Sequence, residues 1–165
     1  MKLQVAFQMD PITDVDLAAD TTFRLAEEAQ NRGHRIFYYN PENLTYDNGR
    51  IIARGNEIKI NRKVEPAVKL GSDIILDLEK DIDMVWLRQD PPFDMLYITT
   101  TFLLERVRES TLVINDPYWV RNSPEKLMIL NFKNLMPPTI ITRNLKAIIE
   151  FRNEHKDIIF ITFKV

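Results

Sequence analysis

The stretch 84–94 constrains this chain most, because an apolar run there ends abruptly at two prolines. Its first four residues, Met-Val-Trp-Leu, are typical of a buried β-strand. The Asp-Pro-Pro at 90–92 must end that strand, because proline lacks the N–H that a β-ladder requires. Arg88 and Asp90 therefore follow the carboxyl end of a strand. In open α/β sheets this end usually borders the ligand crevice, where an arginine suits a carboxylate or a phosphate. The same pattern fits equally well with a different interpretation, in which Arg88 and Asp90 form only a weak ion pair beside a surface turn.

Two other expected strands end at an Asp-Pro dipeptide. Residues 3–8 alternate apolar and more polar side chains before Asp10, and the β-prone residues 111–114 precede Asp116. Polar side chains thus follow three separate strands. If the strands are parallel, these side chains meet at one edge of the sheet.

A strand, a helix and a second strand are expected in the N-terminal segment. Apolar residues recur at helical spacing over residues 17–32, and Gly33 is suited to the position after a helix end. Residues 34–39 then form a β-prone run. This order is typical of a βαβ unit, whose two strands are parallel.

The pattern changes after residue 40. Asn48-Gly49 lies between two β-prone runs, which predicts a small β-hairpin. Residues 58–60 suggest a further short strand. Residues 62–80 are polar and weakly patterned, so we expect a surface excursion there.

Helices and strands are expected to alternate in the C-terminal half. A helix over 94–109, with Asp94 as N-cap, carries apolar residues on more than one side and should be buried within the domain or against another subunit. A helix is also expected from Ser123, with Pro124 at its first position and Lys126 in its first turn, where helix N-termini attract anions. The remaining expected elements are a short helical stretch through residue 119, strands at 139–142 and 157–165, and a helix at 144–155.

Composition excludes several classes of protein. The 165 residues carry a net charge of −2 and contain no cysteine. They also contain no apolar run long enough to span a bilayer. We therefore expect a cytoplasmic protein that binds neither nucleic acid nor a membrane. The 4 glycines are scattered, which excludes a glycine-rich phosphate loop. His34 and His155 lack partners at metal-ligand spacing, and the early aspartates lack calcium-site spacing.

The residues alone thus predict an α/β protein with an open, mostly parallel sheet, flanking helices and a small hairpin. Its strand ends carry polar groups that could bind a ligand. No complete catalytic constellation and no metal site is visible in the sequence.

Five short motifs follow one another along the chain: Met9-Asp10-Pro11, Leu87-Arg88-Gln89-Asp90-Pro91-Pro92-Phe93-Asp94, Leu104-Glu105-Arg106, Val113-Ile114-Asn115-Asp116-Pro117 and Asn122-Ser123-Pro124-Glu125-Lys126-Leu127. Together they resemble the N-terminal part of bacterial glutathione synthetases, in order and at the expected spacing. The most specific of them is Arg-x-Asp-Pro-Pro-Phe-Asp, and the resemblance extends over nearly the whole chain.

The resemblance implies a Rossmann-like pre-ATP-grasp domain at 1–122 and the start of an ATP-grasp region at 123–165. It also implies an ATP-dependent ligase. Such enzymes phosphorylate a carboxylate of γ-glutamylcysteine with ATP and Mg²⁺, and glycine then attacks the acyl phosphate. The family's enzymes are typically homotetramers.

The resemblance also assigns roles to three residues. It maps a substrate-contacting arginine onto Arg88, a nucleotide-contacting lysine onto Lys126, and a supporting role in substrate binding onto Asp10. It assigns no catalytic residue and no metal ligand within these 165 residues.

The family continues beyond Phe160 with a glycine-rich phosphate loop and the carboxylates that hold Mg²⁺, whereas this chain ends at Val165. We therefore expect an N-terminal portion that is inactive alone and binds neither ATP nor Mg²⁺ tightly. A stand-alone α/β module for binding or subunit assembly, which uses the 94–109 helix as an interface, is the alternative.

Overall fold

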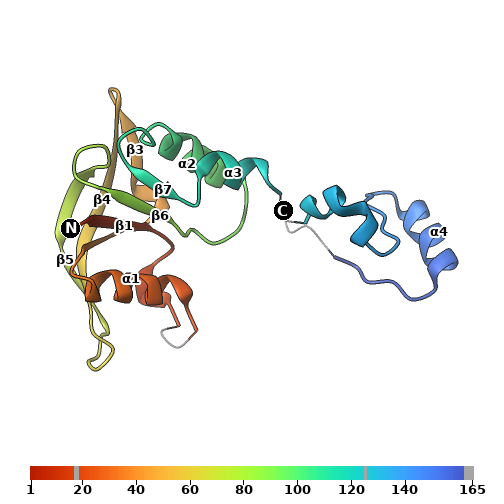
Figure 1. Cartoon of the computed structure of the whole chain (residues 1–165), viewed down its shortest axis with the longest axis horizontal. Coiled ribbons are helices and arrows are strands. Elements are labelled where there is room, and N and C mark those ends of the chain that lie inside the picture. Colours follow the sequence, from red (N-terminus) through yellow and green to blue (C-terminus); the bar gives the residue numbers. More distant parts are fainter. Residues whose placement is uncertain (17–18, 125, 162–165) are drawn as a thin grey trace. The chain divides into compact units, whose positions relative to one another are not determined.

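The computed structural model describes residues 1–16, 19–124 and 126–161 (Figure 1). Its contacts divide the chain into two compact units, Met1–Asn122 and Ser123–Val165. The first unit contains the whole β-sheet, and the second is built from helical segments. No described helix is long and apolar enough to cross a membrane.

Four parallel strands form the centre of the first unit. β1 (Gln4–Gln8) pairs with β2 (Arg35–Tyr39) on one side and with β6 (Met84–Leu87) on the other, and β6 pairs with β7 (Leu112–Ile114). The βαβ unit and the three strands before Asp-Pro dipeptides are therefore confirmed. The sheet is an open α/β sheet, mostly parallel at its centre and flanked by helices.

The helices cover the two faces of this sheet separately, as Figure 1 shows for α1 (Thr21–Asn31) and α2 (Met95–Glu105). Phe7 of β1 packs in one buried cluster with Phe23 of α1. Ala6, whose side chain points to the opposite face, lies in a second cluster with Leu104 of α2. A parallel sheet with helices on both faces is doubly wound, and here successive strands are added to opposite sides of the boundary between β1 and β6.

Polar side chains mark where the helices begin. The Asp20 carboxylate accepts a hydrogen bond from Phe23 N at 2.6 Å, and the Asp94 carboxylate accepts one from Tyr97 N at 2.9 Å. α1 therefore begins at Thr21, later than expected, and residues 17 and 18 lie outside the described part of the chain. Asp94 is the expected cap, but α2 ends at Glu105 rather than at 109.

α3 (Pro117–Asn122) follows β7, which confirms the short helical stretch expected through residue 119.

The hairpin is confirmed between β3 (Leu44–Asp47) and β4 (Arg50–Ile60). Asn48 and Gly49 both have positive φ, at 48° and 92°, as a two-residue turn of this kind requires. The separate short strand at 58–60 was a wrong prediction, because these residues form the end of the long β4.

The surface excursion at 62–80 was also a wrong prediction. It contains β5 (Val68–Asp77), which pairs antiparallel with β4 over most of its length. Most of the β5 residues are exposed, so their side chains show no apolar alternation. The formation of such an exposed strand depends more on hydrogen bonds to the backbone of the neighbouring strand than on the hydrophobic pattern of its own side chains.

The second unit contains η3 (Met128–Leu135) and α4 (Leu145–His155), which confirms the helix expected at 144–155. The Asn144 side chain caps α4 by accepting a hydrogen bond from Lys146 N. A regular helix from Ser123 was a wrong prediction: the 3₁₀ segment η3 begins only at Met128 and is broken at Phe132. The strand expected at 139–142 is absent, and residues 157–161 are not a strand either. Residues 162–165 lie outside the described part. Within 126–161 there is no strand for such segments to pair with.

Candidate functional site

The candidate site lies at the carboxyl edge of the parallel strands. Asp10 follows β1, Arg88 follows β6 directly, and Asp116 follows β7. From β1 the chain passes through α1 to β2, whereas from β6 it passes through α2 to β7 on the other side. The two paths diverge between β1 and β6, which is where open α/β sheets form their ligand crevice.

A hydrogen bond ties the two central strand ends together. The backbone N–H of Asp90 donates to the Asp10 carboxylate at 2.7 Å. Just before it, Arg88 N donates to the Gln8 carbonyl at 2.8 Å, which continues the ladder past the end of β6. The loops after β1 and β6 are therefore fixed relative to each other.

The Arg88 side chain is held by the first turn of α1. Its Nε donates to Thr22 Oγ1 at 3.0 Å, and one terminal nitrogen donates to Thr21 Oγ1 at 3.0 Å. Both acceptors are neutral hydroxyls, so these bonds orient the guanidinium without neutralising it. Within the described residues, no ion pair joins Arg88 to Asp90, so the surface pair allowed by the sequence is not formed.

Tyr97, in the first turn of α2, lies in the electrostatic field of this edge. Burial raises its pKa, Arg88 lowers it, and Asp90 and Asp10 raise it further. Positively and negatively charged side chains therefore both lie close enough to Tyr97 to affect its pKa. A guanidinium close to two carboxylates complements a molecule that carries both a carboxylate and an ammonium group.

Behind these charges lies a buried amide. Gln8 is fully buried, and its Nε2 donates to Gln89 Oε1 at 3.4 Å. The same Gln89 oxygen accepts from Thr100 Oγ1 at 3.3 Å. Among the described residues, the Gln8 Oε1 atom has no hydrogen-bond partner. An unpaired acceptor at this edge could accept a hydrogen bond from a ligand or a water molecule.

Sequence reasoning missed Gln8, Tyr97 and the two threonines that hold Arg88. A signal existed for Gln8, because it is a polar residue at the end of an otherwise apolar strand. Thr21 and Thr22 follow a helix cap, and nothing local in the sequence distinguishes them from other residues of a first turn.

Lys126 belongs to the other compact unit. It is exposed and lies in a turn in which Leu127 N donates to the Pro124 carbonyl at 2.9 Å. Because no regular helix begins at Ser123, the expected attraction of a helix N-terminus for anions does not apply to Lys126.

The two histidines make different local contacts. His34 Nδ1 accepts a hydrogen bond from Leu3 N at 3.2 Å, and the His155 ring packs on Phe151 with centroids 4.4 Å apart. In the part of the chain that the structure describes, no group of three or more His, Cys, Asp or Glu residues could hold a metal ion.

Two protein-family models match consecutive parts of the chain. Residues 3–121 match the N-terminal domain of prokaryotic glutathione synthetase, and residues 125–164 match the ATP-grasp domain of the same family.

Curated relatives are similar over nearly the whole chain. The glutathione synthetase of Mesorhizobium japonicum is 49% identical over 159 residues, which are 96% of this chain and 50% of that protein. That of Brucella melitensis is 48% identical, with 96% and 51% covered, and that of Vibrio parahaemolyticus is 35% identical, with 95% and 50% covered. The chain spans about half the length of these relatives. It belongs to the prokaryotic glutathione synthetase family.

Proposed function

We propose that this chain supplies the substrate-binding edge of a glutathione synthetase, which joins γ-glutamylcysteine to glycine with ATP through an acyl phosphate. The observation that carries the proposal is the orientation of Arg88 by two neutral threonine hydroxyls at the divergence of β1 and β6. Family membership supports the same conclusion. The two compact units correspond in this proposal to the pre-ATP-grasp domain and the start of the ATP-grasp domain.

In this proposal Arg88 binds a substrate carboxylate through its remaining N–H groups. A guanidinium can form two parallel hydrogen bonds with a carboxylate, and a lysine cannot reproduce that geometry. Asp10 supports the site because it fixes the loop that carries Asp90. The nearby carboxylates favour a substrate that also carries an ammonium group, as γ-glutamylcysteine does.

Lys126 is proposed as a contact to nucleotide phosphate, because it lies at the start of the segment that matches the ATP-grasp domain. The family uses ATP and Mg²⁺, but the described residues form no cluster that could hold the metal. We expect the 165 residues alone neither to form glutathione nor to bind ATP and Mg²⁺ tightly.

The test is a titration of the isotope-labelled chain with γ-glutamylcysteine, followed by NMR. We expect millimolar binding, with shifts at residues 8–10 and 88–90 that disappear in Arg88→Ala. Arg32→Ala is the matched control, because Arg32 is exposed after the end of α1, just before β2 begins at the opposite end of the parallel strands. Shifts that survive in Arg88→Ala, or that are lost equally in Arg32→Ala, would contradict the proposal.

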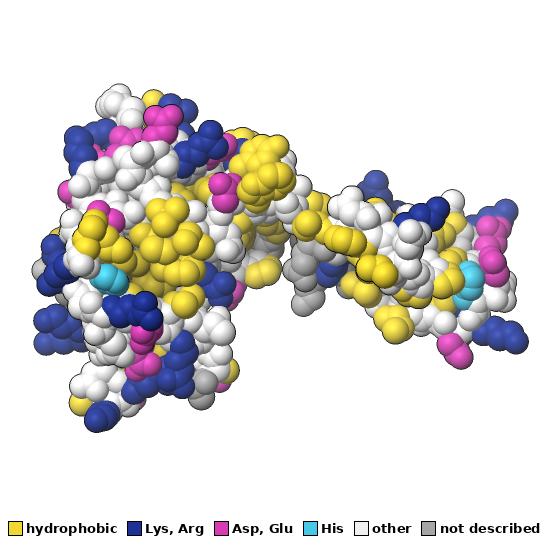
Figure 2. All heavy atoms as spheres, in the orientation of Figure 1, with side chains coloured by type: hydrophobic (Ala, Val, Ile, Leu, Met, Phe, Trp, Pro, Cys, Tyr) yellow, Lys and Arg dark blue, Asp and Glu magenta, His cyan; other side chains and the backbone are white. Residues whose placement is uncertain are grey.

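A second function, subunit assembly, is favoured by the outer surface of α2 and α3. Met95, Leu96, Phe102 and Trp119 are 71%, 75%, 53% and 62% exposed. Figure 2 shows hydrophobic side chains gathered over these helices. An apolar surface of this kind often marks a protein interface. The first unit thus leaves one side of α2 uncovered, and we propose that a homo-oligomer covers it.

Light scattering at micromolar concentrations tests this assembly. We expect an oligomer that Leu96→Glu converts to a monomer, because a carboxylate cannot be buried unpaired. Ile75→Glu, at an exposed apolar residue of β5, should leave the oligomer intact. A monomeric wild-type chain would exclude this second function and leave the substrate-binding proposal unaffected.

A further inference from the structure

A hollow of about 550 Å³ lies at the end of the sheet opposite the candidate site. It is lined by Lys2 before β1, by His34 and Arg35 at the start of β2, and by Lys59 and Lys69 where β4 ends and β5 begins. The parallel strands β1 and β2 run away from this hollow towards the edge that carries Asp10 and Arg88. The hollow is therefore separate from the candidate substrate site.

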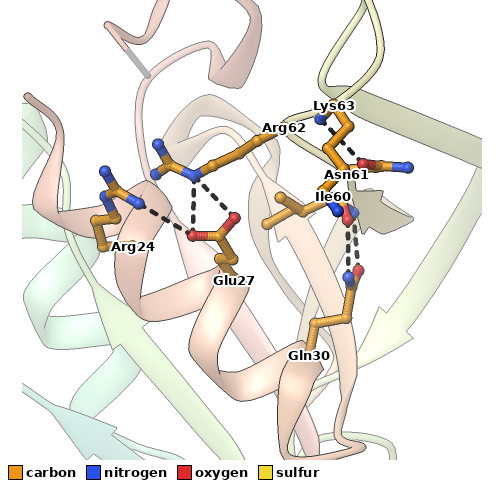
Figure 3. A network of polar contacts seen from close by, with 7 residues as sticks. All are labelled: Arg24, Glu27, Gln30, Ile60, Asn61, Arg62 and Lys63. Atoms are coloured by element: carbon orange, nitrogen blue, oxygen red, sulfur yellow. Dashed lines mark hydrogen bonds and ion pairs between the residues drawn. The ribbon is translucent and has the colours of Figure 1, made fainter. Parts of the chain in front are cut away.

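One wall of the hollow is fixed to helix α1. The side-chain amide of Gln30 donates to the Ile60 carbonyl at 2.8 Å and accepts from Ile60 N at 2.7 Å (Figure 3). The Arg62 Nε donates to both oxygens of Glu27 at 2.8 Å, and its guanidinium lies 4.6 Å from the centre of the Phe23 ring. These contacts hold the end of β4 and the segment after it against α1.

The charges around the hollow are mostly positive. The one carboxylate in its lining, Glu57, is engaged by Arg35 at 3.2 and 2.8 Å. The pKa of Glu57 is lowered first by this hydrogen-bonded contact and then by the charges of Arg35, Lys59 and Lys2. Across the described residues, no ion pair supplies Lys2, Lys59 or Lys69 with a carboxylate.

His34 adds a neutral donor to this lining. Because its Nδ1 accepts the hydrogen bond from Leu3 N, the neutral imidazole carries its hydrogen on Nε2. The lining therefore offers ammonium groups, a guanidinium and an imidazole N–H, and a single carboxylate that already has a partner.

Two of the lysines face each other directly. Lys59 of β4 and Lys69 of β5 are Cα partners in the antiparallel ladder. Like charges in directly opposite positions destabilise a strand pair. A bound anion between them would remove this repulsion, which makes their pairing a second observation that favours an anionic ligand.

We propose that this hollow binds a small molecule with two or more phosphate groups. Ammonium groups bind phosphate as point charges, and several of them favour a multiply charged anion over a single carboxylate. The volume suits a small ligand, and the net charge of −2 on the whole chain gives no extended basic surface for nucleic acid. Val64, Pro66 and Ala67 provide apolar contacts for the rest of the ligand.

Calorimetric titration of the whole chain with inorganic tripolyphosphate at about 0.15 M salt tests the proposal, because exposed charges farther apart than about 8 Å are screened there. Lys59→Gln and Lys69→Gln should each weaken binding by about two- to fivefold, the effect of losing one exposed ion pair. Glu57→Gln should strengthen binding, because it releases Arg35. Inorganic monophosphate should bind more weakly than tripolyphosphate.

Lys63→Gln is the matched control. Lys63 is exposed on the neighbouring loop but does not line the hollow, so its loss changes the net charge equally and should leave binding unchanged. Equal weakening by Lys63→Gln and Lys59→Gln would show general charge attraction and overturn the proposal. No binding of tripolyphosphate, or binding that Lys126→Gln abolishes and Lys59→Gln does not, would overturn it as well.

This test does not depend on the proposed enzyme. Neither Arg88 nor the α2 surface contributes to the hollow. A chain that binds tripolyphosphate but not γ-glutamylcysteine would support this inference and contradict the proposed substrate site.

Discussion

The Asp10 carboxylate accepts the backbone N–H of Asp90 at 2.7 Å across 80 residues of sequence. Both residues belong to strand ends that the Asp-Pro dipeptides mark. The contact joins the loop after β1 to the loop after β6, and Arg88 is the first residue of the second loop. This charge-assisted hydrogen bond is therefore one of the contacts that set the geometry of the candidate site.

Loss of this bond should destabilise the first unit. Asp10→Ala is expected to lower the free energy of unfolding by about 1 kcal/mol, because the Asp90 N–H loses its acceptor. Asp10→Asn keeps an acceptor oxygen and should recover part of that loss. Urea denaturation measures both. Equal stability of wild type and Asp10→Ala would show that the contact contributes nothing to folding.

Tyr39 carries a buried hydroxyl that has no hydrogen-bond partner among the described residues. Tyr39→Phe should therefore raise the free energy of unfolding by about 1 kcal/mol near neutral pH. A destabilised Tyr39→Phe variant would mean that the hydroxyl does have a partner.

The same residue should affect stability at alkaline pH. Burial raises the pKa of Tyr39 well above its ordinary value of 10.0, so above that pH the unfolded chain loses a proton that the folded chain keeps. Wild-type stability should fall as the pH rises beyond 10, and Tyr39→Phe should lack this component. Denaturation at pH 7 and above pH 10 would show a widening difference between the two proteins.

Gln30 holds the end of β4 through two hydrogen bonds to the Ile60 backbone. Gln30→Leu should lower the free energy of unfolding by about 2 kcal/mol and speed hydrogen exchange at the Ile60 amide. Arg24→Gln is the control, because the Arg24–Glu27 pair is more exposed and should contribute less than about 1 kcal/mol. Unchanged exchange at Ile60 would contradict this assignment.

Gly55 lies where β4 passes close to β2. A Cβ atom at this position would be 2.2 Å from the Tyr38 carbonyl oxygen and 2.9 Å from Tyr39 Cβ. Gly55→Ala should therefore destabilise the chain by about 2 kcal/mol or more, because the backbone oxygen cannot move without disturbing the sheet. Arg54→Ala, at the exposed neighbouring residue, should change stability by less than about 0.5 kcal/mol. A tolerated Gly55→Ala would show that β2 and β4 can separate locally.

Local patterns in the sequence predicted most of the first unit. The strands before Asp10, Asp90 and Asp116 could be found because an apolar run followed by proline permits few alternatives. The Asn48-Gly49 turn was predictable because positive φ at two successive residues selects these residue types.

Other elements could not be predicted, because they depend on partners that are distant in sequence. The exposed strand β5 forms because β4 offers its backbone, whereas the similarly β-prone residues 139–142 have no strand to pair with among the described residues of the second unit. A backbone hydrogen bond in a sheet requires both strands, and a sequence pattern describes only one of them.

Polar groups, Arg88 among them, could be placed after the strand ends from the sequence, because the order of residues along the chain sets what comes after each strand. Their contacts follow only from how the elements pack. Thr21 and Thr22 reach Arg88, and Lys59 faces Lys69, only because packing of the apolar faces brings separate segments to these positions. Hydrophobic burial is non-directional, so it drives the collapse without recording in any local pattern which polar side chains will meet.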